Sequence, residues 1–418
     1  MKVLELFAGI GACSTALKRI GLDIEIVDAV EIDKYAMSSF NAIHNTNFEP
    51  QDITKWNKQF EDVDLITHGS PCQDFSVAGK QAGGDIGSGT RSSLMYETIR
   101  IVGQIRPKYV LWENVKNLLS KKHKHNFDAY IETMNILGYN SYYQVLNAKD
   151  YGIPQNRERV YTISIRKDID NKQFKFPEKE ELKLRLKDML ENEVDEKYYL
   201  SDKAISGLQR QENLKHKPNY IEDKEICNTI DTKVGDGTHY SPYIRNWENY
   251  CIEIKNATKK GYDEATEGDS INLAYPDSNT RRGRVGHQVA QTLQCNDSIG
   301  VVTTTIVPKL INKDIRLKNL VNKTNFEEGK VLNMDLYNQT TNENISQCLT
   351  EPHHNSQRLF DGLRIRKLTP KECWRLMGFS DEDFDKAQSI PMSNTQLYKQ
   401  AGNSIVVNVL EKIFKNLF

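Results

Sequence analysis

Short apolar runs alternate with segments of helical periodicity along residues 1–166. The runs are rich in Val, Ile, Leu and aromatic residues, and they predict buried strands at residues 3–7, 24–30, 63–67, 109–112, 142–146 and 160–165. Apolar residues recur with helical spacing at residues 12–20, 34–45 and 127–137. Strands that alternate with helices are typical of a parallel sheet, so the pattern predicts an α/β fold with a doubly wound, mostly parallel, Rossmann-like sheet.

The pattern changes at residue 167, where charged and Asn-rich sequence begins. Residues 179–192 have a helical pattern, whereas residues 219–356 mix short β-like runs with Gly, Asn, Asp and Thr. We therefore predict a smaller, mainly β or irregular domain at residues 167–362.

Helical order returns close to the C-terminal end. Thr369 and Glu372 form a T-x-x-E capping box with a proline at the first helical position. Residues 404–418 carry a broad apolar face, which predicts a helix that docks on the first domain. We expect residues 363–418 to complete the domain that residues 1–166 begin.

Composition narrows the class of protein. The chain has 418 residues, and an apolar share of 38% supports at least one large core. The sequence opens directly as a strand, without a secretory segment, so we expect a cytosolic protein. The seven cysteines show no C-x-x-C pair and no zinc-like spacing, which favours reduced thiols over disulfides or a structural metal. With a formal net charge of −1, any binding of nucleic acid must depend on local basic clusters.

Cys72 has the placement expected of a nucleophile. It follows Pro71 at the end of a predicted strand, where ligands of open α/β sheets collect. Residues 80–91 are rich in glycine, with almost no apolar side chain, so they could close over a substrate. Because a thiol has a reference pKa of about 8.5, Cys72 needs a polar, partly open setting to act as a thiolate.

A glycine turn follows the first predicted strand. Gly9 and Gly11 allow a ligand to approach the backbone closely, although Ser14 replaces the third glycine of G-x-G-x-x-G and a tight turn without a ligand stays possible. Glu31 and Asp52 follow at strand ends, and carboxylates there can bind ribose hydroxyls and an adenine amino group. Either acid alone would more often be solvated.

Three further charged residues follow strands. Glu113, at the end of the strand after Cys72, could protonate a ring nitrogen, although an exposed strand-end carboxylate is equally consistent with its position. Arg157 and Arg159 share one face of an extended segment and could grip an anionic or ring substrate. Surface salt bridges are the alternative for this pair.

Together these residues closely resemble the DNA cytosine-C5 methyltransferase family. The family motifs occur in order over residues 1–166 and 364–418. They are Phe7-Ala8-Gly9-Ile10-Gly11, Pro71-Cys72-Gln73, Glu113-Asn114-Val115, Gln155-x-Arg157-x-Arg159, Arg366-Lys367-Leu368-Thr369-Pro370-x-Glu372 and Gln400-Ala401-Gly402-Asn403-Ser404. Residues 167–362 match no motif, as expected of the family's variable target-recognition domain. Glu5 stands where the family more often has aspartate, and we expect little consequence.

The resemblance implies a mechanism and a cofactor. A Cys72 thiolate adds to C6 of a flipped-out cytosine while Glu113 engages N3, and C5 then takes a methyl group from S-adenosylmethionine, leaving S-adenosylhomocysteine. Arg157 and Arg159 would hold the flipped ring and the nearby loop. The residues implied to surround the cofactor are Phe7, Gly9, Gly11, Glu31, Ile32, Asp52, Ile53, Pro71, Asn403 and Ser404.

Duplex DNA is the expected partner. Arginine and polar side chains can read base edges, whereas most lysines contact phosphate. We expect DNA contacts from the loop after Cys72 and from an arginine-rich segment of the second domain, at Gln73, Ser76, Arg91, Arg281, Arg282 and Arg284. Taken singly, each of the arginines in that segment fits a phosphate contact or a solvated charge better than a base-reading role.

Other functions remain open at this point. A nicotinamide-dependent dehydrogenase would share the opening unit but would not need the Pro-Cys-Gln segment with two downstream arginines. A tRNA-cytosine methyltransferase shares the catalytic set, but its recognition insert is smaller. A DNA-binding protein with a vestigial catalytic domain would lack a key residue, and none is missing. We therefore expect a monomeric prokaryotic or phage enzyme of the bacterial cytosol, with a restriction endonuclease of the same specificity as its functional partner.

Overall fold

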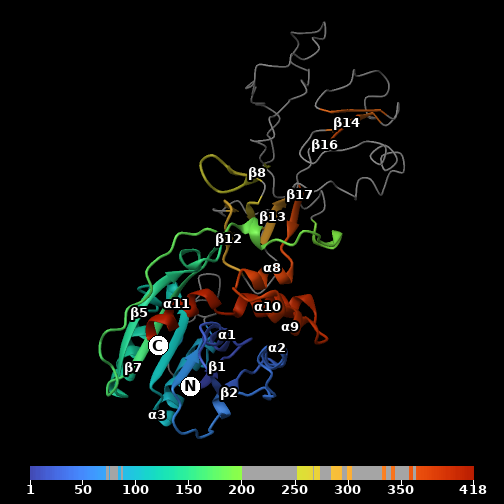
Figure 1. Ribbon diagram of the computed structural model, residues 1–418. Coiled ribbons are helices and arrows are strands. Elements are labelled where there is room, and N and C mark those ends of the chain that lie inside the picture. The colour runs from blue at the N-terminus through green and yellow to red at the C-terminus, as the bar shows by residue number, and fades with distance from the viewer. Residues whose placement is uncertain are drawn as a thin grey trace. The chain divides into compact units, whose positions relative to one another are not determined.

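The computed structural model describes residues 1–71, 75, 83–85, 88–199, 252–266, 268–273, 284–293, 299–303, 332–335, 340–343, 357–360 and 364–418 (Figure 1). The chain divides into two compact units. The first unit comprises Met1–Glu193, Gln288–Ser298 and Leu368–Phe418. The second unit comprises Val194–His287 and Ile299–Lys367.

A mostly parallel sheet is the centre of the first unit, as the strand pattern predicts. In spatial order its strands are β2 (Glu25–Val30), β1 (Lys2–Leu6), β3 (Leu65–His68), β4 (Tyr109–Val115), β7 (Glu158–Arg166) and β5 (Tyr139–Asn147). The first four run parallel, whereas β7 pairs antiparallel with both β4 and β5. The carboxyl ends of β1 to β4 therefore deliver their following turns to one edge of the sheet.

Side chains alternate between two covered faces of this sheet. Leu4 and Trp112 point into a core cluster that includes Met95 of α3 (Met95–Ile105) and Tyr130 of α4 (Lys124–Ile136). Glu5, next to Leu4, points the other way and accepts a hydrogen bond from the backbone of α1 (Ala12–Arg19). Helices on both faces make the fold doubly wound, which confirms the predicted α/β class.

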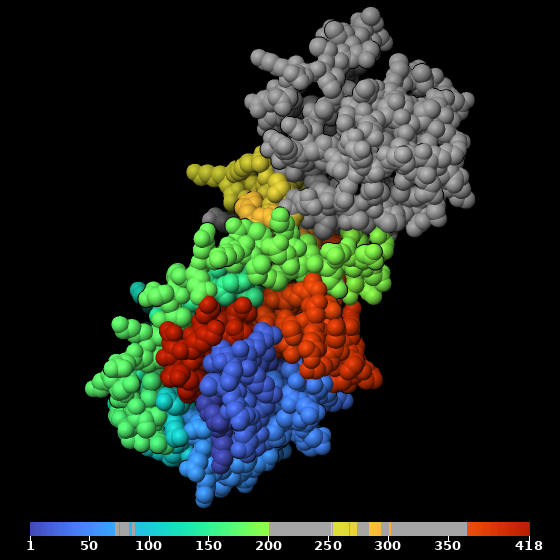
Figure 2. Space-filling model, viewed as in Figure 1, coloured from blue at the N-terminus to red at the C-terminus, as the bar shows by residue number. Residues whose placement is uncertain are grey.

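The C-terminal helices belong to the same unit and are α8 (Pro370–Arg375), α9 (Asp381–Gln388), α10 (Asn394–Asn403) and α11 (Val407–Leu417). The predicted capping box is present, since Thr369 and Glu372 each accept from the other's backbone N–H. α11 packs on α1, where Arg19 pairs with Glu411 at 3.5 Å and with Asp383 of α9 at 3.0 Å. Figure 2 shows this red C-terminal surface adjoining the dark blue surface of the first residues. The docking of the last helix is therefore confirmed.

Besides the C-terminal helices, two more segments beyond residue 167 belong to the first unit, one up to Glu193 and the other Gln288–Ser298. The helix predicted at residues 179–192 is wrong, because only a short 3-10 turn forms there, η5 (Leu186–Met189). The backbone N–H of Leu186 instead donates to the carbonyl of Gln288 at 2.8 Å. Further on, β12 (Ala290–Gln291) pairs parallel with β6 (Gln155–Asn156). The first unit thus extends beyond the change in composition at residue 167, to Glu193. It also includes Gln288–Ser298 from the middle of the chain.

One helix of the first unit, α3, is not predicted from the sequence pattern. The helix α2 (Lys34–His44) follows β2 as predicted, capped by the side chain of Asp33. The other 3-10 turns are η1 (Ile53–Lys55), η2 (Arg91–Leu94), η3 (Lys116–Leu119) and η4 (Ala148–Tyr151).

The second unit is built mainly from short antiparallel strands, as predicted. These are β8 (Ile252–Lys255) with β9 (Tyr262–Ala265), then β11 (Val285–Gly286), β10 (Ser270–Asn272), β13 (Ile299–Thr303) and β17 (Arg364–Lys367), and finally β15 (Thr340–Glu343), β14 (Leu332–Asp335) and β16 (Gln357–Phe360). A 3-10 turn, η6 (Glu196–Tyr198), precedes them. Ile252, Ile254, Ala265 and Ile271 form a small buried cluster.

Candidate active site

The glycine turn after β1 has a backbone that few side chains would permit. Phe7, Gly9 and Gly11 have φ values of 52°, 56° and 83°. A Cβ on Gly9 would meet nothing within 4 Å, so the backbone is open to a ligand there. A Cβ on Gly11 would lie 2.0 Å from Nε2 of His44 and is impossible. The backbone of the turn is thus accessible at Gly9, whereas the space beside Gly11 is occupied by the side chain of His44.

Glu31, at the end of β2, faces this turn. Its carboxylate accepts from the backbone N–H of Gly9 at 3.0 Å and from that of Asp33 at 2.8 Å. Burial raises the pKa of Glu31, and these backbone bonds oppose the rise. Next to it, the apolar side chain of Ile32 is 71% exposed. An acceptor beside an exposed apolar surface suits a ligand with hydroxyl groups and a flat ring.

The turn that begins at Asp52 is stabilised by hydrogen bonds with other residues of the protein. Oδ1 of Asp52 accepts from the backbone N–H of Thr54 at 3.0 Å and from its hydroxyl at 2.8 Å, and the hydroxyl bond is the main reason why the pKa of Asp52 is lowered. Arg100 donates to the carbonyl of Ile53 at 3.1 Å and to that of Trp56 at 2.9 Å. The side chain of Ile53 is buried in the core, so this residue offers a ligand only its backbone.

The C-terminal segment lies beside the residues that follow β2. Lys399 forms an ion pair with Asp33, and Gln400 donates to the carbonyl of Tyr35 at 3.0 Å. The two predicted cofactor residues at the end of α10 follow directly: Asn403 is exposed and Ser404 is buried. Residues more than three hundred and fifty positions apart in the chain therefore share one site.

The segment that leads to Cys72 is fixed at Ser70. Nε1 of Trp112 donates to the Ser70 hydroxyl at 3.0 Å, and Nδ2 of Asn114 donates to the Ser70 carbonyl at 3.2 Å. Pro71 follows, half-buried, whereas Cys72 lies outside the described residues. Two predicted DNA contacts, Gln73 and Ser76, also lie outside them. Arg91, a third predicted contact, is described and is exposed at the start of η2.

Glu113 lies on β4 beside this segment, because His68 and Trp112 pair across β3 and β4. The Glu113 side chain is 10% exposed, and a Cβ placed on Gly69 would lie 3.8 Å from its Oε2. Burial raises the pKa of Glu113, and the charges of Arg159 and Arg157 oppose that rise. The alternative of an exposed strand-end carboxylate is therefore wrong for Glu113, and the site contains a buried carboxyl whose pKa is raised.

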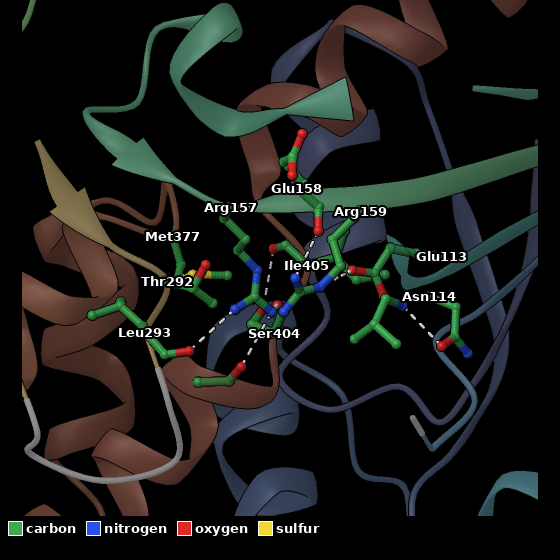
Figure 3. Close-up of polar contacts among 12 residues, drawn as sticks. Glu113, Asn114, Arg157, Glu158, Arg159, Thr292, Leu293, Met377, Ser404 and Ile405 are labelled. Atoms are coloured by element: carbon green, nitrogen blue, oxygen red, sulfur yellow. Dashed lines mark hydrogen bonds and ion pairs between the residues drawn. The ribbon is translucent and has the colours of Figure 1, made fainter. Parts of the chain in front are cut away.

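The two arginines have different partners. Nε of Arg159 lies 3.2 Å from Oε1 of Glu113 (Figure 3). The guanidinium of Arg157 instead donates to three backbone carbonyls, at 3.3 Å to Leu293, 3.2 Å to Gly402 and 2.9 Å to Ser404. Arg157 is 4% exposed.

The expectation that both arginines hold a substrate ring is therefore corrected. The bonds of Arg157 fasten the segment around Leu293 and the end of α10 to the central sheet. The expectation stays a proposal for Arg159 alone.

The comparisons with known proteins decide the family. The model of the C-5 cytosine-specific DNA methylase family matches residues 1–418. The chain belongs to this family. A similar relative is the orphan methyltransferase M.SPRI of Bacillus phage SPR, 32% identical over all of this chain and 97% of the relative. Another is the type II methyltransferase M2.ScrFI of Lactococcus lactis subsp. cremoris, also 32% identical, over all of this chain and 99% of the relative.

Solved structures of this family's fold are similar as well. A DNMT2 structure from Spodoptera frugiperda superposes with a TM-score of 0.53 at 21% identity, covering 100% of this chain and 99% of that one. The Entamoeba histolytica methyltransferase EhMeth gives 0.56 at 15% identity, covering 100% and 98%. The resemblance that the motifs indicate is confirmed, and the chain is a cytosine-C5 DNA methyltransferase.

One predicted DNA contact needs correction. Arg284 is fully buried in the second unit, and its guanidinium donates to the carbonyl of Asn272 at 3.2 Å. A buried side chain bonded to the backbone of a neighbouring strand does not reach a DNA groove. Arg281 and Arg282 lie outside the described residues.

Two residues that are not among the predicted site residues, Gln155 and Thr292, also bind segments around this site. Gln155 is buried, donates to the carbonyl of Leu376 at 2.7 Å and accepts from the backbone N–H of Leu293 at 3.1 Å. Thr292 donates to the carbonyl of Asn156 at 2.6 Å. Gln155 could have been found because it opens the same motif as the two arginines, but nothing local marks the segment that it binds.

Proposed function

We propose that the protein transfers the methyl group of S-adenosylmethionine to C5 of a flipped-out cytosine in a specific duplex DNA sequence, through a covalent bond between Cys72 and C6. The observation that carries the proposal is the buried carboxyl of Glu113 beside Arg159, at the sheet edge to which β3 leads. A protonated carboxyl in that place suits a ring nitrogen that must gain a proton as a nucleophile adds.

The sulfur of Cys72 bonds to C6 while the Glu113 proton moves to N3, which makes C5 enamine-like. C5 then takes the methyl group, which S-adenosylmethionine supplies when bound. The C5 proton then leaves to solvent, the Cys72 thiolate is eliminated from C6 and the N3 proton returns to Glu113, which restores the ring as 5-methylcytosine. In these steps Arg159 orients Glu113 and holds its negative charge once the proton has left.

The residues around the glycine turn fit such a cofactor. Glu31 has the acceptor oxygens for ribose hydroxyls, and the exposed side chain of Ile32 offers a flat apolar surface to a purine. The open backbone face at Gly9 leaves room for close approach. We assign the remaining contacts to Phe7, Gly11, Asp52, the backbone of Ile53, Pro71, Asn403 and Ser404.

The target carbon is inaccessible inside a duplex, so the base must leave the stack at a cost of a few kcal/mol. We assign contacts that compensate for this cost to Gln73, Ser76, Arg91, Arg281 and Arg282. The proposed setting is restriction-modification or protection of phage or host DNA in the bacterial cytosol, supported by relatives that are named type II and orphan methyltransferases. No helix among the described residues is long and apolar enough to cross a membrane.

Bisulfite sequencing of DNA from a host that expresses the chain tests this function and reads the target. The proposal predicts protected cytosines within one short sequence. A matched host expressing Cys72→Ser should show none, while the purified variant still binds S-adenosylhomocysteine. Methylation by that variant at the wild-type level would overturn the assignment of Cys72.

A further inference from the structure

His44, the last residue of α2, lies directly under the glycine turn. The side chain is 7% exposed, and its Nε2 lies 3.1 Å from the carbonyl oxygen of Gly11. On the other side of the ring, Nδ1 lies 3.3 Å from Nζ of Lys18 on α1. The ring also packs on Phe40, with ring centroids 4.7 Å apart. None of the family motifs in this sequence contains His44 or Lys18.

The two neighbours fix the direction of these hydrogen bonds. Burial, reinforced by the charge of Lys18, lowers the pKa of His44 to about 4, so the ring is neutral near neutral pH. A neutral imidazole has one donor and one acceptor nitrogen, and the ammonium of Lys18 can only donate. Nδ1 is therefore the acceptor, and Nε2 carries the hydrogen and donates to the Gly11 carbonyl.

This bond holds the lower side of the turn in place. The Gly11 carbonyl also accepts from the backbone N–H of Thr15 at 3.0 Å, which is the first bond of α1. At the upper side, Glu31 accepts from the backbone N–H of Gly9. The turn is thus fastened at both ends before any ligand arrives, and a site that is already ordered loses less entropy on binding.

We infer that His44 is a positioning residue for cofactor binding, which acts through the Gly11 carbonyl while Lys18 selects its tautomer. The inference rests on the proposed function, because the turn matters only if S-adenosylmethionine binds there. The alternative is that His44 merely fills space between α2 and the turn. That alternative needs the shape of the ring and not its N–H.

Three variants separate the two roles. His44→Phe keeps an aromatic ring against Phe40 and removes the donor, so the dissociation constant for S-adenosylhomocysteine should rise about fivefold. His44→Gln restores an N–H donor and should stay within about twofold of wild type. Lys18→Met leaves the ring but removes its partner, and it should raise the constant about twofold. Isothermal titration calorimetry on the full chain without DNA measures all three.

A control separates affinity from stability. Met134→Ala opens a cavity under α4, which packs on β5 at the sheet edge opposite β2. It should lower the melting temperature without changing the dissociation constant. In steady-state assays, His44→Phe should raise KM for S-adenosylmethionine about fivefold and leave kcat within about twofold, because the turn binds and does not react.

A nitrogen NMR spectrum of wild-type protein gives a readout that does not depend on any variant folding. It should show His44 with hydrogen on Nε2 and a bare Nδ1. A hydrogen on Nδ1, or a His44→Phe protein with unchanged affinity and a lowered melting temperature, would overturn the inference. If wild-type protein itself fails to bind S-adenosylhomocysteine, the proposed function fails instead, so the two failures are distinguishable.

Discussion

The turns after β1 and β3 follow neighbouring strands, but the polar groups at the two turns differ in how completely they are hydrogen-bonded. In the glycine turn after β1, Gly9 donates to Glu31 and the Gly11 carbonyl has both Thr15 and His44 as donors. Beside the turn after β3, Oε1 of Glu113 is buried without a hydrogen-bond partner among the described residues and lies 3.2 Å from Nε of Arg159.

The difference separates binding from chemistry. Paired groups hold a shape at little further cost, which suits a surface that must receive a cofactor. A buried carboxyl with incomplete pairing holds its proton more tightly than one in water, and this suits a group that must hand a proton to a substrate. Changes at the two turns should therefore alter different measured quantities.

The largest effect is expected for Glu113→Gln. The amide keeps the shape of the side chain but cannot protonate N3, so kcat should fall by a factor on the order of a thousand. The dissociation constant for S-adenosylhomocysteine should stay unchanged, since Glu113 lies on β4 beside the turn after β3 and not in the glycine turn. Single-turnover assays with calorimetry check both, and a loss of affinity with kcat preserved would break the division between the turns.

The wild-type pH profile sharpens the same point. Burial raises the pKa of Glu113, so the protonated form that the mechanism needs is lost as the pH rises through that value. The rate of the chemical step should therefore decline on the alkaline side, and the Gln variant should lack this decline.

The next effect distinguishes the two arginines. Arg157→Ala leaves three buried carbonyls without their donor, so the free energy of unfolding should fall by about 4 kcal/mol. Arg159→Ala removes the ion-pair partner of Glu113 and should lower kcat. The free energy of unfolding should fall less than for Arg157→Ala, because Arg159 is less buried than Arg157. Urea unfolding beside steady-state kinetics measures the pair. Equal losses of stability would contradict the assignment of Arg157 as a fastening residue.

The smallest effect concerns Glu5, under the glycine turn. Burial raises the pKa of Glu5 from 4.5 to about 7, opposed mainly by its hydrogen bonds with Ser14. Between these values the unfolded chain releases the proton while the folded protein keeps it, so the stability that Glu5 contributes is lost as the pH rises. Glu5→Gln has no such proton, and its stability relative to wild type should increase by about 3 kcal/mol across that range.

Thermal or urea unfolding at several pH values tests this prediction. A constant difference between Glu5→Gln and wild type would show that Glu5 does not titrate between pH 4.5 and 7.

Local periodicity predicts most of the central sheet, because the apolar run of each strand and the helical spacing after it lie close together in the sequence. The exceptions have physical causes. In α3, Gly103 and the preceding glycine-rich stretch obscure a helical pattern that Ile101 and Ile105 follow. At residues 179–192, tertiary hydrogen bonds override the helix propensity of the side chains. One of these bonds runs from the backbone N–H of Leu186 to the carbonyl of Gln288.

The candidate site is predictable in its chemistry and less so in its partners. Strand alternation correctly puts Arg157 and Arg159 on one face, but the carbonyls that Arg157 binds come from Leu293 and the end of α10, far along the chain. Arg284 sits in an arginine-rich run that suggests a surface, yet it is buried against Asn272. In both cases nonlocal pairing decides the role, and no local pattern encodes it.

The most direct test of the central claim uses duplex DNA with 5-fluorocytosine at the target that bisulfite sequencing identifies. Fluorine cannot leave C5 as a proton does, so the bond between sulfur and C6 should persist once methyl transfer has occurred. We expect a stable complex that forms only with S-adenosylmethionine, with the DNA attached to the peptide that contains Cys72, and no complex for Cys72→Ser. Normal methylation of unmodified DNA without such a complex, or attachment at another residue, would contradict it.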